Sequence, residues 1–418
     1  MIDAVAKDGY AYVAVEHVLR HSGASRSTFY EQFTDKNDCF LAAQREIADR
    51  LLRTLELEAR LDDPSAIHET VIRVLVHFAC AEQPAARLLL IETLAAGPRA
   101  LDVREEMASA FEGVLERSWK RAPEDAPQID LSAKALVGSV LRLLAIRMRR
   151  GEGAMHNLQD ELILWVQSYR VAPGTPLRWR KLSHTPRPQL LSEIEHAAMP
   201  TPGPLPRGRH KLSATEVARN QCDRILYAVA ELANEMGYAA MTVTDICARS
   251  RVSRKVFYTH YVDKQAAALE AHELGFRQTM SVSSRAFFGA SGWPERVWEA
   301  GRAFARFLVD YPAIAWLGFA ESYAIGPAAI QRAEDSQVSF TIFLQEGYQL
   351  LRESEPSPTA VEAIAATIFE LVYQEVRRKR TAGLASVLPD ITYMCLAPFI
   401  GTQAANLFID AKLQSSDH

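Results

Sequence analysis

Apolar residues recur at steps of three and four along most of the chain, which is the spacing of an amphipathic helix. Residues 136–148 and 361–376 show this pattern most clearly. Alternating apolar and polar positions, the pattern of half-buried strands, are not found between turn signals. We therefore predict an all-α fold.

Two parts of the sequence are similar to each other. Residues 9–36 align without a gap to residues 237–264, and 11 of the 28 positions are identical. Shorter matches follow in the same order, including Glu92 with Glu321 and Arg149-Arg150 with Arg377-Arg378. A single match of this kind could be chance, whereas several in register indicate a duplicated unit of about 200 residues.

The two repeats are separated by a segment of different composition. Residues 171–210 hold eight of the 20 prolines together with several arginines. Since proline lacks a backbone donor and fixes φ, we expect a semi-extended linker, interrupted by a short helix near residues 190–198. The expected divisions are 1–44 (DNA-binding, first helix short), 45–172 (regulatory), 173–212 (basic linker), 213–272 (DNA-binding) and 273–412 (regulatory).

The second repeat contains the pattern of a helix-turn-helix. A helix over residues 217–236 ends at Gly237, which suits a left-handed cap, and Thr242 with Asp245 resembles a capping box that starts the next helix. That helix reaches about Arg249, and Ser253 caps a short helix beyond a tight turn. We expect Ile246 and Phe257 to form the small core between the helices.

In this motif the second helix enters the major groove and its first side chains meet base edges. Arg254 can donate two hydrogen bonds to guanine, while Tyr258, His260 and Lys264 suit phosphates. The expected DNA contacts of the second repeat are Thr242, Arg254, Lys255, Val256, Tyr258, Thr259, His260 and Lys264. Those of the first repeat are Arg26, Ser27, Thr28, Tyr30, Gln32 and Lys36.

The strings VSRKVFYTHYVDKQAAALEA and ASRSTFYEQFTDKNDCFLAA resemble the recognition helix and fourth helix of the TetR family. The resemblance covers about 45 residues of each repeat. It implies a three-helix DNA-binding head on an all-α, ligand-sensing and dimerising domain. It also implies repression of transcription that a small apolar or aromatic effector relieves; the sign of regulation is left open.

The two heads are expected to differ in strength. Residues 207–264 contain ten basic and six acidic residues, including a basic arm of Arg207, Arg209 and Lys211, whereas residues 1–36 contain four basic and five acidic. Phosphate neutralisation drives affinity, so the second head should bind DNA more strongly. The first repeat has Ala14 where the second has the Thr242 cap, and Glu31 would repel phosphate. Its short first helix indicates a weakened head or a start upstream of Met1.

Composition narrows the function further. The net charge is −4, so any DNA contact must come from a local patch. Five scattered cysteines favour a reduced, cytoplasmic protein without disulfides. The uncharged stretch Ile391–Ile409 is expected to be a buried packing or dimerisation helix rather than a membrane span. Phosphate-binding loops, nucleophile motifs and metal-ligand spacings are missing from the sequence, so we expect no enzyme and no cofactor.

Other features have two readings each. His17 and His21 have the spacing of zinc ligands, but exposed or phosphate-facing histidines are the better reading. The basic run 377–380 reads as a solvated helix end rather than a DNA contact. Aromatic residues between 293 and 323 read as core before pocket. Glu92 and Glu321 could orient a ligand or lie at a surface, so no ligand-binding residue is named.

Our hypothesis is that the repeats pair as an intramolecular pseudo-dimer through their last helices, near residues 158–169 and 392–407. Two recognition helices with different side chains would then read an asymmetric operator. A dimer of fused chains stays possible. The alternative function is a ligand-binding or protein-interaction scaffold in which one or both heads are inactive.

Overall fold

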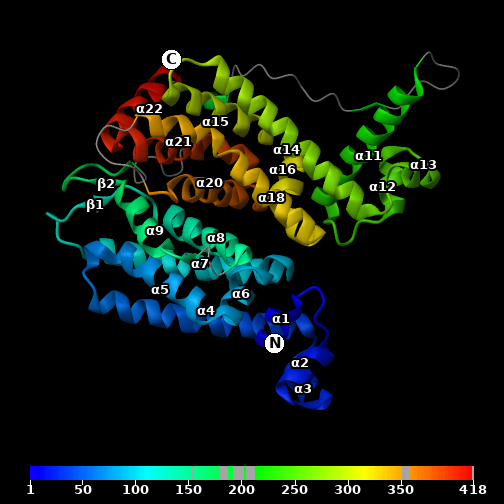
Figure 1. Cartoon of the computed structure of the whole chain (residues 1–418), viewed down its shortest axis with the longest axis horizontal. Helices are drawn as coiled ribbons and strands as arrows, with labels where there is room; N and C mark the ends of the chain where they lie inside the picture. Colours follow the sequence, from blue (N-terminus) through cyan, green and yellow to red (C-terminus); the bar gives the residue numbers. More distant parts are fainter. Residues whose placement is uncertain (152–154, 179–186, 192–201, 204–211, 351–356, 417–418) are drawn as a thin grey trace. The chain divides into compact units, whose positions relative to one another are not determined.

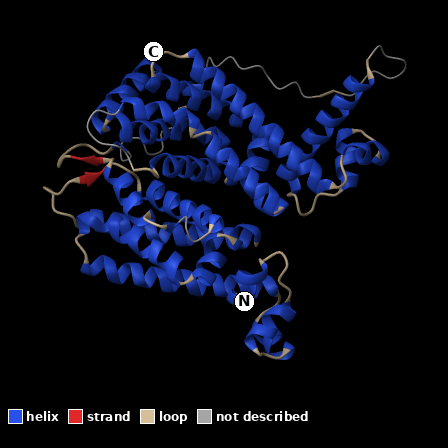
Figure 2. Cartoon of the chain, viewed as in Figure 1, coloured by secondary structure: helices blue, strands red, loops and turns tan. Residues whose placement is uncertain are grey.

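The structure of the chain, a computed structural model, describes residues 1–151, 155–178, 187–191, 202–203, 212–350 and 357–416. These residues are helical apart from loops and one antiparallel pair of two-residue strands, β1 (Gln128–Ile129) and β2 (Arg170–Val171) (Figure 2). Gln128 pairs with Val171 and Ile129 with Arg170. The prediction of an all-α fold is confirmed.

The chain divides into two compact units. The first contains residues 1–183, 344–371 and 393–409, and the second contains residues 184–343, 372–392 and 410–418. Of the helices that the structure describes, four late in the chain supply residues to both units: α19 (Ile342–Gln345), α20 (Ala360–Arg377), α21 (Leu384–Ile400) and α22 (Thr402–Ser416).

The first unit begins with three short helices, α1 (Ile2–Asp8), α2 (Val15–Ser22) and α3 (Arg26–Gln32), which we call head 1. Longer helices follow, and α4 and α7 pack along each other (Figure 1). Leu55, Ile72, Phe111 and Leu136 are fully buried among them. These helices are α4 (Lys36–Leu61), α5 (Ile67–Ala81), α6 (Gln83–Leu90), α7 (Pro98–Trp119), α8 (Ala133–Arg150) and α9 (Leu158–Gln167), with 3-10 turns η1 (Pro64–Ala66) and η2 (Glu92–Ala95).

The helices in the rest of the chain follow a similar order. Helices α11 (Ala214–Met236), α12 (Val243–Ser250) and α13 (Arg254–His260) form head 2, and α14 (Lys264–Gly289) packs along α15 (Trp293–Asp310) (Figure 1). Between them and α20 lie α16 (Pro312–Trp316), a π-helical turn η5 (Leu317–Glu321), α17 (Ser322–Ile325), α18 (Pro327–Ser339), α19 (Ile342–Gln345) and η6 (Glu346–Leu350). The turn η7 (Thr381–Gly383) precedes α21, and α22 (Thr402–Ser416) follows it.

The linker prediction is only partly within the described residues. Pro188–Leu191 form a 3-10 turn, η4, at the start of the segment expected to be helical. Residues 192–198, the rest of that expected helix, and the basic arm of Arg207, Arg209 and Lys211 lie outside the described residues.

The uncharged stretch Ile391–Ile409 is not one helix, which corrects the prediction. Gly401, with φ of +84°, separates α21 from α22. Among the described residues, Thr381–Ile400 is long and apolar enough to cross a membrane, but 61% of that window is buried in the fold. Helices Pro64–Ala81 and Gln83–Ala95 also pass as a pair, bent by 114°. Core helices pass the same test, so neither indicates a membrane protein.

Candidate nucleic-acid interface

Head 2 is held together by a small apolar core. Ile246 of α12 and Phe257 of α13 are fully buried, as predicted, and Tyr261 packs beside Phe257. The predicted capping box at the start of α12 is also present. The Asp245 amide donates to Thr242 Oγ1 (3.2 Å), and the Thr242 amide donates to Asp245 Oδ2 (2.9 Å). These bonds from Thr242 hold the pKa of the Asp245 carboxyl below its ordinary value.

The turn before the recognition helix is fixed by its backbone partners. Arg251 adopts a left-handed conformation (φ +54°), and Arg224 of α11 donates to the Ser250 and Arg251 carbonyls. Ser253 then caps α13 by accepting from the Val256 amide at 3.2 Å. The start of the recognition helix therefore has a defined position in the head.

The first side chains of α13 point outward. Arg254, Lys255, Tyr258 and Thr259 are exposed, and Val256 is half-buried. Within the described part of the chain, the Arg254 and Lys255 side chains have no hydrogen-bond or ion-pair partner. Both positive charges are thus available to a ligand outside the protein.

Three other expected DNA contacts already have partners. Thr242 is the cap of α12, His260 Nε2 lies 3.0 Å from Gln221 Oε1, and Lys264 Nζ donates to the carbonyls of Tyr238 (3.1 Å) and Met241 (2.9 Å). Their contacts to phosphate stay predictions. Sequence alone does not reveal that the Lys264 side chain contacts the turn between α11 and α12.

Head 1 has the same backbone plan. Ser25 caps α3 by accepting from the Thr28 amide at 3.1 Å, and Phe29 is buried like Phe257. Where the threonine cap is missing, His17 replaces half of the capping box, because its Nδ1 accepts from the Ala14 amide at 3.0 Å. His21 Nδ1 lies 2.8 Å from the His17 carbonyl. Among the described residues, no group of three or more His, Cys, Asp or Glu could hold a metal ion.

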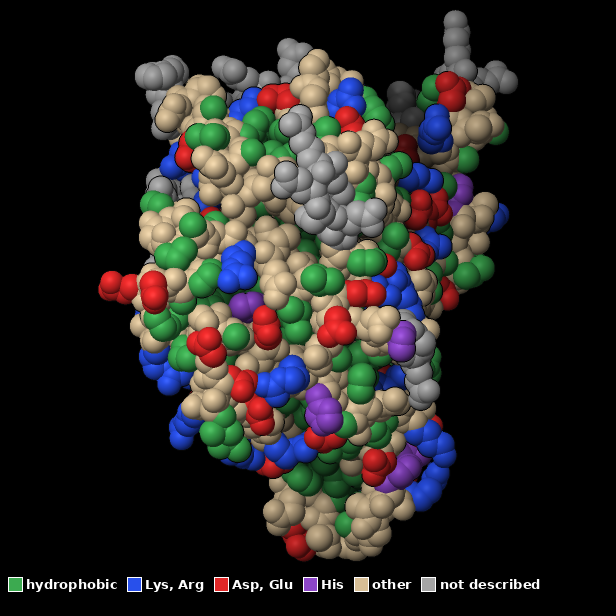
Figure 3. Space-filling model, turned by 60° about the vertical axis from the view of Figure 1, so that its left-hand side comes forward, with side chains coloured by type: hydrophobic (Ala, Val, Ile, Leu, Met, Phe, Trp, Pro, Cys, Tyr) green, Lys and Arg blue, Asp and Glu red, His purple; other side chains and the backbone are tan. Residues whose placement is uncertain are grey.

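The exposed chemistry of head 1 differs from that of head 2. Arg26 forms an ion pair with Glu16 (3.2 Å), and Ser27 donates to Glu31 (3.3 Å). The Thr28 hydroxyl lies 2.9 Å from that of Ser25, while Tyr30 and Gln32 are exposed. Lys36 Nζ donates to the Tyr10 carbonyl at 2.9 Å, as Lys264 does in head 2. The face of head 1 seen at the lower end of Figure 3 carries mainly uncharged side chains.

The family model of bacterial regulatory proteins of the tetR family matches residues 225–271, which run from the middle of α11 through both helices of the motif into α14. The chain contains the DNA-binding domain of a TetR-family regulator. The match covers the helix-turn-helix described above, including Arg254 and Lys255. No curated protein matches the chain.

Three solved structures are similar to part of the regulator. A putative TetR-family transcriptional regulator from Syntrophomonas wolfei shares 21% identity over 42% of this chain and 95% of its own, with a TM-score of 0.35. A regulatory protein in the tetR family from Rhodococcus RHA1 shares 21% identity over 42% of this chain and 96% of its own, with a TM-score of 0.35. A TetR-family transcription regulator from Marinobacter aquaeolei shares 16% identity over 44% of this chain and 97% of its own, with a TM-score of 0.36. Scores this low do not by themselves establish a shared fold.

The regulator ties each head to the helices beyond it through a matched glutamate. Glu92 Oε2 accepts from the Tyr10 amide at 2.9 Å, and Glu321 Oε2 accepts from the Tyr238 amide at 3.0 Å. Both carboxylates are more than nine-tenths buried. Neither glutamate therefore lies simply at a surface, which was one of the two readings of the sequence.

The glycine before each tyrosine allows this contact. Gly9 (φ +77°) and Gly237 (φ +81°) turn the chain toward the carboxylate, and a Cβ there would lie 3.6 Å from its oxygen. At Gly237 ψ is 151°, so the predicted left-handed cap is wrong: φ is positive, but the residue lies outside the left-handed helical region. The extended ψ carries the chain away from α11 and past Glu321.

The second oxygen of each glutamate has a different partner in the two repeats. Glu92 Oε1 pairs with Arg87 (3.1 Å), whereas Glu321 Oε1 accepts from the indole of Trp316 (3.0 Å). Lys379 of the basic run lies 5.3 Å from that indole ring and donates to the Asn234 carbonyl at the end of α11. The run is thus not merely a solvated helix end, because it supports head 2.

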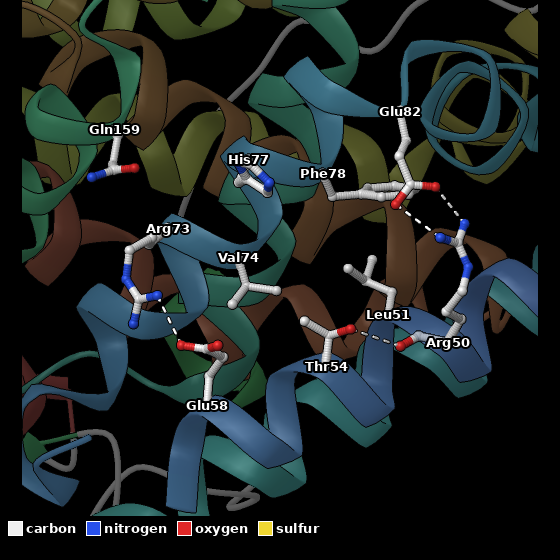
Figure 4. Close-up of a pocket in the computed structure, with 10 residues that line it drawn as sticks. All are labelled: Arg50, Leu51, Thr54, Glu58, Arg73, Val74, His77, Phe78, Glu82 and Gln159. Carbon is white, nitrogen blue, oxygen red and sulfur yellow. Dashed lines mark hydrogen bonds and ion pairs between the residues drawn. The ribbon is translucent and has the colours of Figure 1, made fainter. Parts of the chain in front are cut away.

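The first unit contains a groove of about 500 Å³ between α4 and α5. Its floor is apolar (Leu51, Val74, Phe78), and ion pairs Arg50–Glu82 and Arg73–Glu58 border it (Figure 4). Thr54, His77 and Gln159 complete the lining. The aromatic residues of the second repeat pack mostly against one another, as Phe304 does with Phe319 and Phe340, which favours the core reading.

Proposed function

We propose that this regulator is a ligand-responsive repressor that binds an asymmetric operator as an intramolecular pseudo-dimer. Head 2 provides most of the affinity and head 1 adds a weaker contact. The divisions at residues 44, 172, 212 and 272 separate heads, regulatory domains and linker. The protein would act in the cytoplasm, where its operator lies, and it would need no catalytic group.

The observation that carries the DNA-binding proposal is the state of Arg254 and Lys255. Both project from the first turn of a capped helix, and neither side chain is neutralised by a partner in the described residues. An arginine in this place can contact guanine O6 and N7 together. The lysine adds a phosphate contact, which carries affinity but no sequence information.

Two contacts between the repeats, both inside the first compact unit, support the pseudo-dimer. The hydroxyl of Tyr169, fully buried after α9, donates to the Met394 carbonyl of α21 at 2.9 Å. Arg178 donates to Asn406 of α22 at 2.9 Å. Tyr169, Met394 and Asn406 lie in the segments predicted to pair, 158–169 and 392–407, whereas Arg178 lies beyond the first of them.

The groove of the first unit is our candidate for effector binding. Its apolar floor suits the body of a small apolar or aromatic molecule, and its arginines and glutamates suit a polar end. Arg50 and Thr54 lie on α4, which starts directly after head 1. An effector bound in the groove would therefore contact the helix that positions head 1.

A gel shift with random-sequence duplex at rising salt tests the function. A DNA-binding regulator retards the duplex at low salt and loses affinity steeply as salt rises, because phosphate-bound counterions are released on binding. No shift even at low salt would refute the regulator and favour the scaffold alternative. For head 1, the Arg26–Glu16 ion pair already favours that alternative, because it neutralises the arginine expected to contact DNA.

A further inference from the structure

Equivalent helices of the two repeats carry opposite charges. Helices α8 and α20 are both 18 residues long. They align without a gap at the same offset, 228 residues, that relates residues 9–36 to residues 237–264. Lys134, Arg142 and Arg147 of α8 correspond to Glu362, Glu370 and Glu375 of α20. Most apolar positions between them remain apolar, with Ile146 replaced by Gln374 as an exception, so the sign of the charge is the main difference at these helix positions.

The reversed charges meet in the first unit. Arg147 forms an ion pair with Glu362 at 2.8 Å, and Arg150 approaches the same carboxylate at 3.5 Å. Glu370 receives two hydrogen bonds, of 3.0 and 2.9 Å, from Arg104 of α7, and both side chains are buried. A buried, bidentate pair of this kind has directional as well as electrostatic specificity.

Packing around Glu370 is also specific to the mixed pair. A Cβ on Gly138 of α8 would lie 2.7 Å from Glu370 Cγ, so glycine provides the room for this side chain. The position equivalent to Gly138 in α20 is Ala366. Beside it, the Arg142 guanidinium lies 3.8 Å from the ring centre of Phe369. Each partner therefore fits the other better than it would fit a copy of itself.

Self-pairing reverses the sign of these contacts. Arg147 meets position 362, whose counterpart in α8 is Lys134, and in a two-fold pair equivalent positions meet in the same way. Two α8 helices would set Arg147 against Lys134, and two α20 helices would set Glu375 against Glu362. Like charges at close range disfavour both combinations.

We propose that α8 and α20 are a charge-matched interface that selects the second repeat of the same chain as partner and rejects self-pairing by a second chain. This inference rests on the proposed pseudo-dimer and deepens it, because it states why one chain suffices. The two sides of the interface therefore differ: its basic residues belong to the first repeat and its acidic residues to the second.

Charge exchange at the Arg147–Glu362 pair tests the inference in the full chain. We compare Arg147→Glu, Glu362→Arg and the double exchange by hydrogen–deuterium exchange of α8 and α20 and by light scattering. Each single variant should exchange about tenfold faster in both helices, and the double variant should recover most of the protection. The defect of the single variants should shrink at high salt, which screens the repulsion.

The matched control is Arg99→Glu, the same charge change at an exposed position of α7. It should leave both helices protected. The inference is overturned if the single variants exchange like the wild type, if the double variant is no better than either single one, or if the wild type is a dimer of chains that persists in Arg147→Glu.

A parallel gel shift separates this inference from the proposed function. A chain that shows the predicted exchange pattern but binds no DNA refutes the regulator while the interface stands. A chain that binds DNA as two copies, with no change in α8 and α20 on charge exchange, refutes the interface while DNA binding stands.

Discussion

Arg26 and Arg254 occupy the same position in the two recognition helices but differ in the charge they can offer to DNA. Arg26 is paired with Glu16, whereas the position of Glu16 is Thr244 in head 2. An exposed pair of this kind adds little stability. Its effect is on binding, because a guanidinium held by a carboxylate neutralises less phosphate charge.

The first prediction compares the two recognition helices. Replacing Arg254 and Lys255 with alanine should weaken operator binding by about 10- to 100-fold, the cost of one base contact and one phosphate contact. The matched change of Arg26 and Ser27 should cost less. Titrations of both double variants against the same duplex decide this, and a larger loss from head 1 would reverse our ranking of the heads.

The second prediction concerns the acid that holds Arg26. Glu16→Thr installs the head 2 residue and should raise the affinity of head 1 about fivefold at low salt, with a steeper salt dependence. The measurement is made in the Arg254→Ala/Lys255→Ala background, where head 2 contributes least. Glu124→Thr, the same charge change at an exposed loop position, is the control. Equal affinities for both variants would show that the pair does not limit binding.

The third prediction concerns His272 of α14, whose counterpart in α4 is the buried Gln44. Burial and the nearby Arg332 lower the pKa of His272 to about 4, and the Gly318 carbonyl only partly opposes this. The unfolded chain, with a pKa near 6.5, therefore binds a proton first, so folding stability is full above about pH 6.5 and falls toward pH 4.

His272→Gln should remove this loss. Between pH 7 and pH 5 the variant should lose about 2 kcal/mol less unfolding free energy than the wild type, measured by chemical denaturation. The difference between the two proteins is the readout, because the buried His68, whose pKa is also lowered by burial, contributes equally to both. Parallel pH curves for the two proteins would contradict the assignment.

Much of head 2 could be predicted at the residue scale because its caps are local. Thr242 and Asp245 are three residues apart, and Phe257 follows Ser253 by one turn, so spacing alone places them. The partners of Arg26 and Lys264 could not be predicted in this way. Their carboxylate or carbonyl lies 10 to 26 residues away, and spacing does not show which of several directions a long side chain takes.

At the scale of elements, each head is joined to the helices beyond it by a buried carboxylate. Glu92 and Glu321 accept from the amides two residues after the ends of α1 and α11, respectively, and Lys36 and Lys264 donate to carbonyls of the same turns. The turn between the first two helices is thus bonded on both sides. A change in the helices that carry the glutamate would be transmitted to the head through this turn.

The fourth prediction tests this connection. Glu321→Ala leaves the Tyr238 amide and the Trp316 indole without their acceptor and should cost about 1–3 kcal/mol. Amide exchange at residues 237–241 should quicken. Glu321→Gln keeps one acceptor oxygen and should lose less. If alanine and glutamine behave alike, the carboxylate does not hold the turn.

Helix positions could be predicted from periodicity, but breaks between buried helices could not. Residues 391–409 carry no charged side chain, and α21 ends at Gly401, whose φ is positive. Glycine favours helix ends but also lies inside a buried helix of this chain, as Gly138 does in α8, so its presence alone does not predict a break. The same limit applies at Gly237, where the need to reach Glu321 sets ψ.

At the scale of the whole molecule, the two segments that align in the sequence differ in their chemistry. Head 2 has a complete capping box and unpaired basic residues, while head 1 relies on His17 for its cap and pairs its arginine. The interface helices have opposite charge. Unequal heads predict unequal half-sites, and a mixed interface predicts that one chain contains both.

The most direct test is selection of operator sequences from random duplex by the full chain, with the number of chains per duplex measured by light scattering. We predict two unlike half-sites whose centres are about one helical turn (roughly 10 base pairs) apart, bound by a single chain, with the better-defined half-site lost in Arg254→Ala/Lys255→Ala. A palindromic site occupied by two chains would contradict the account.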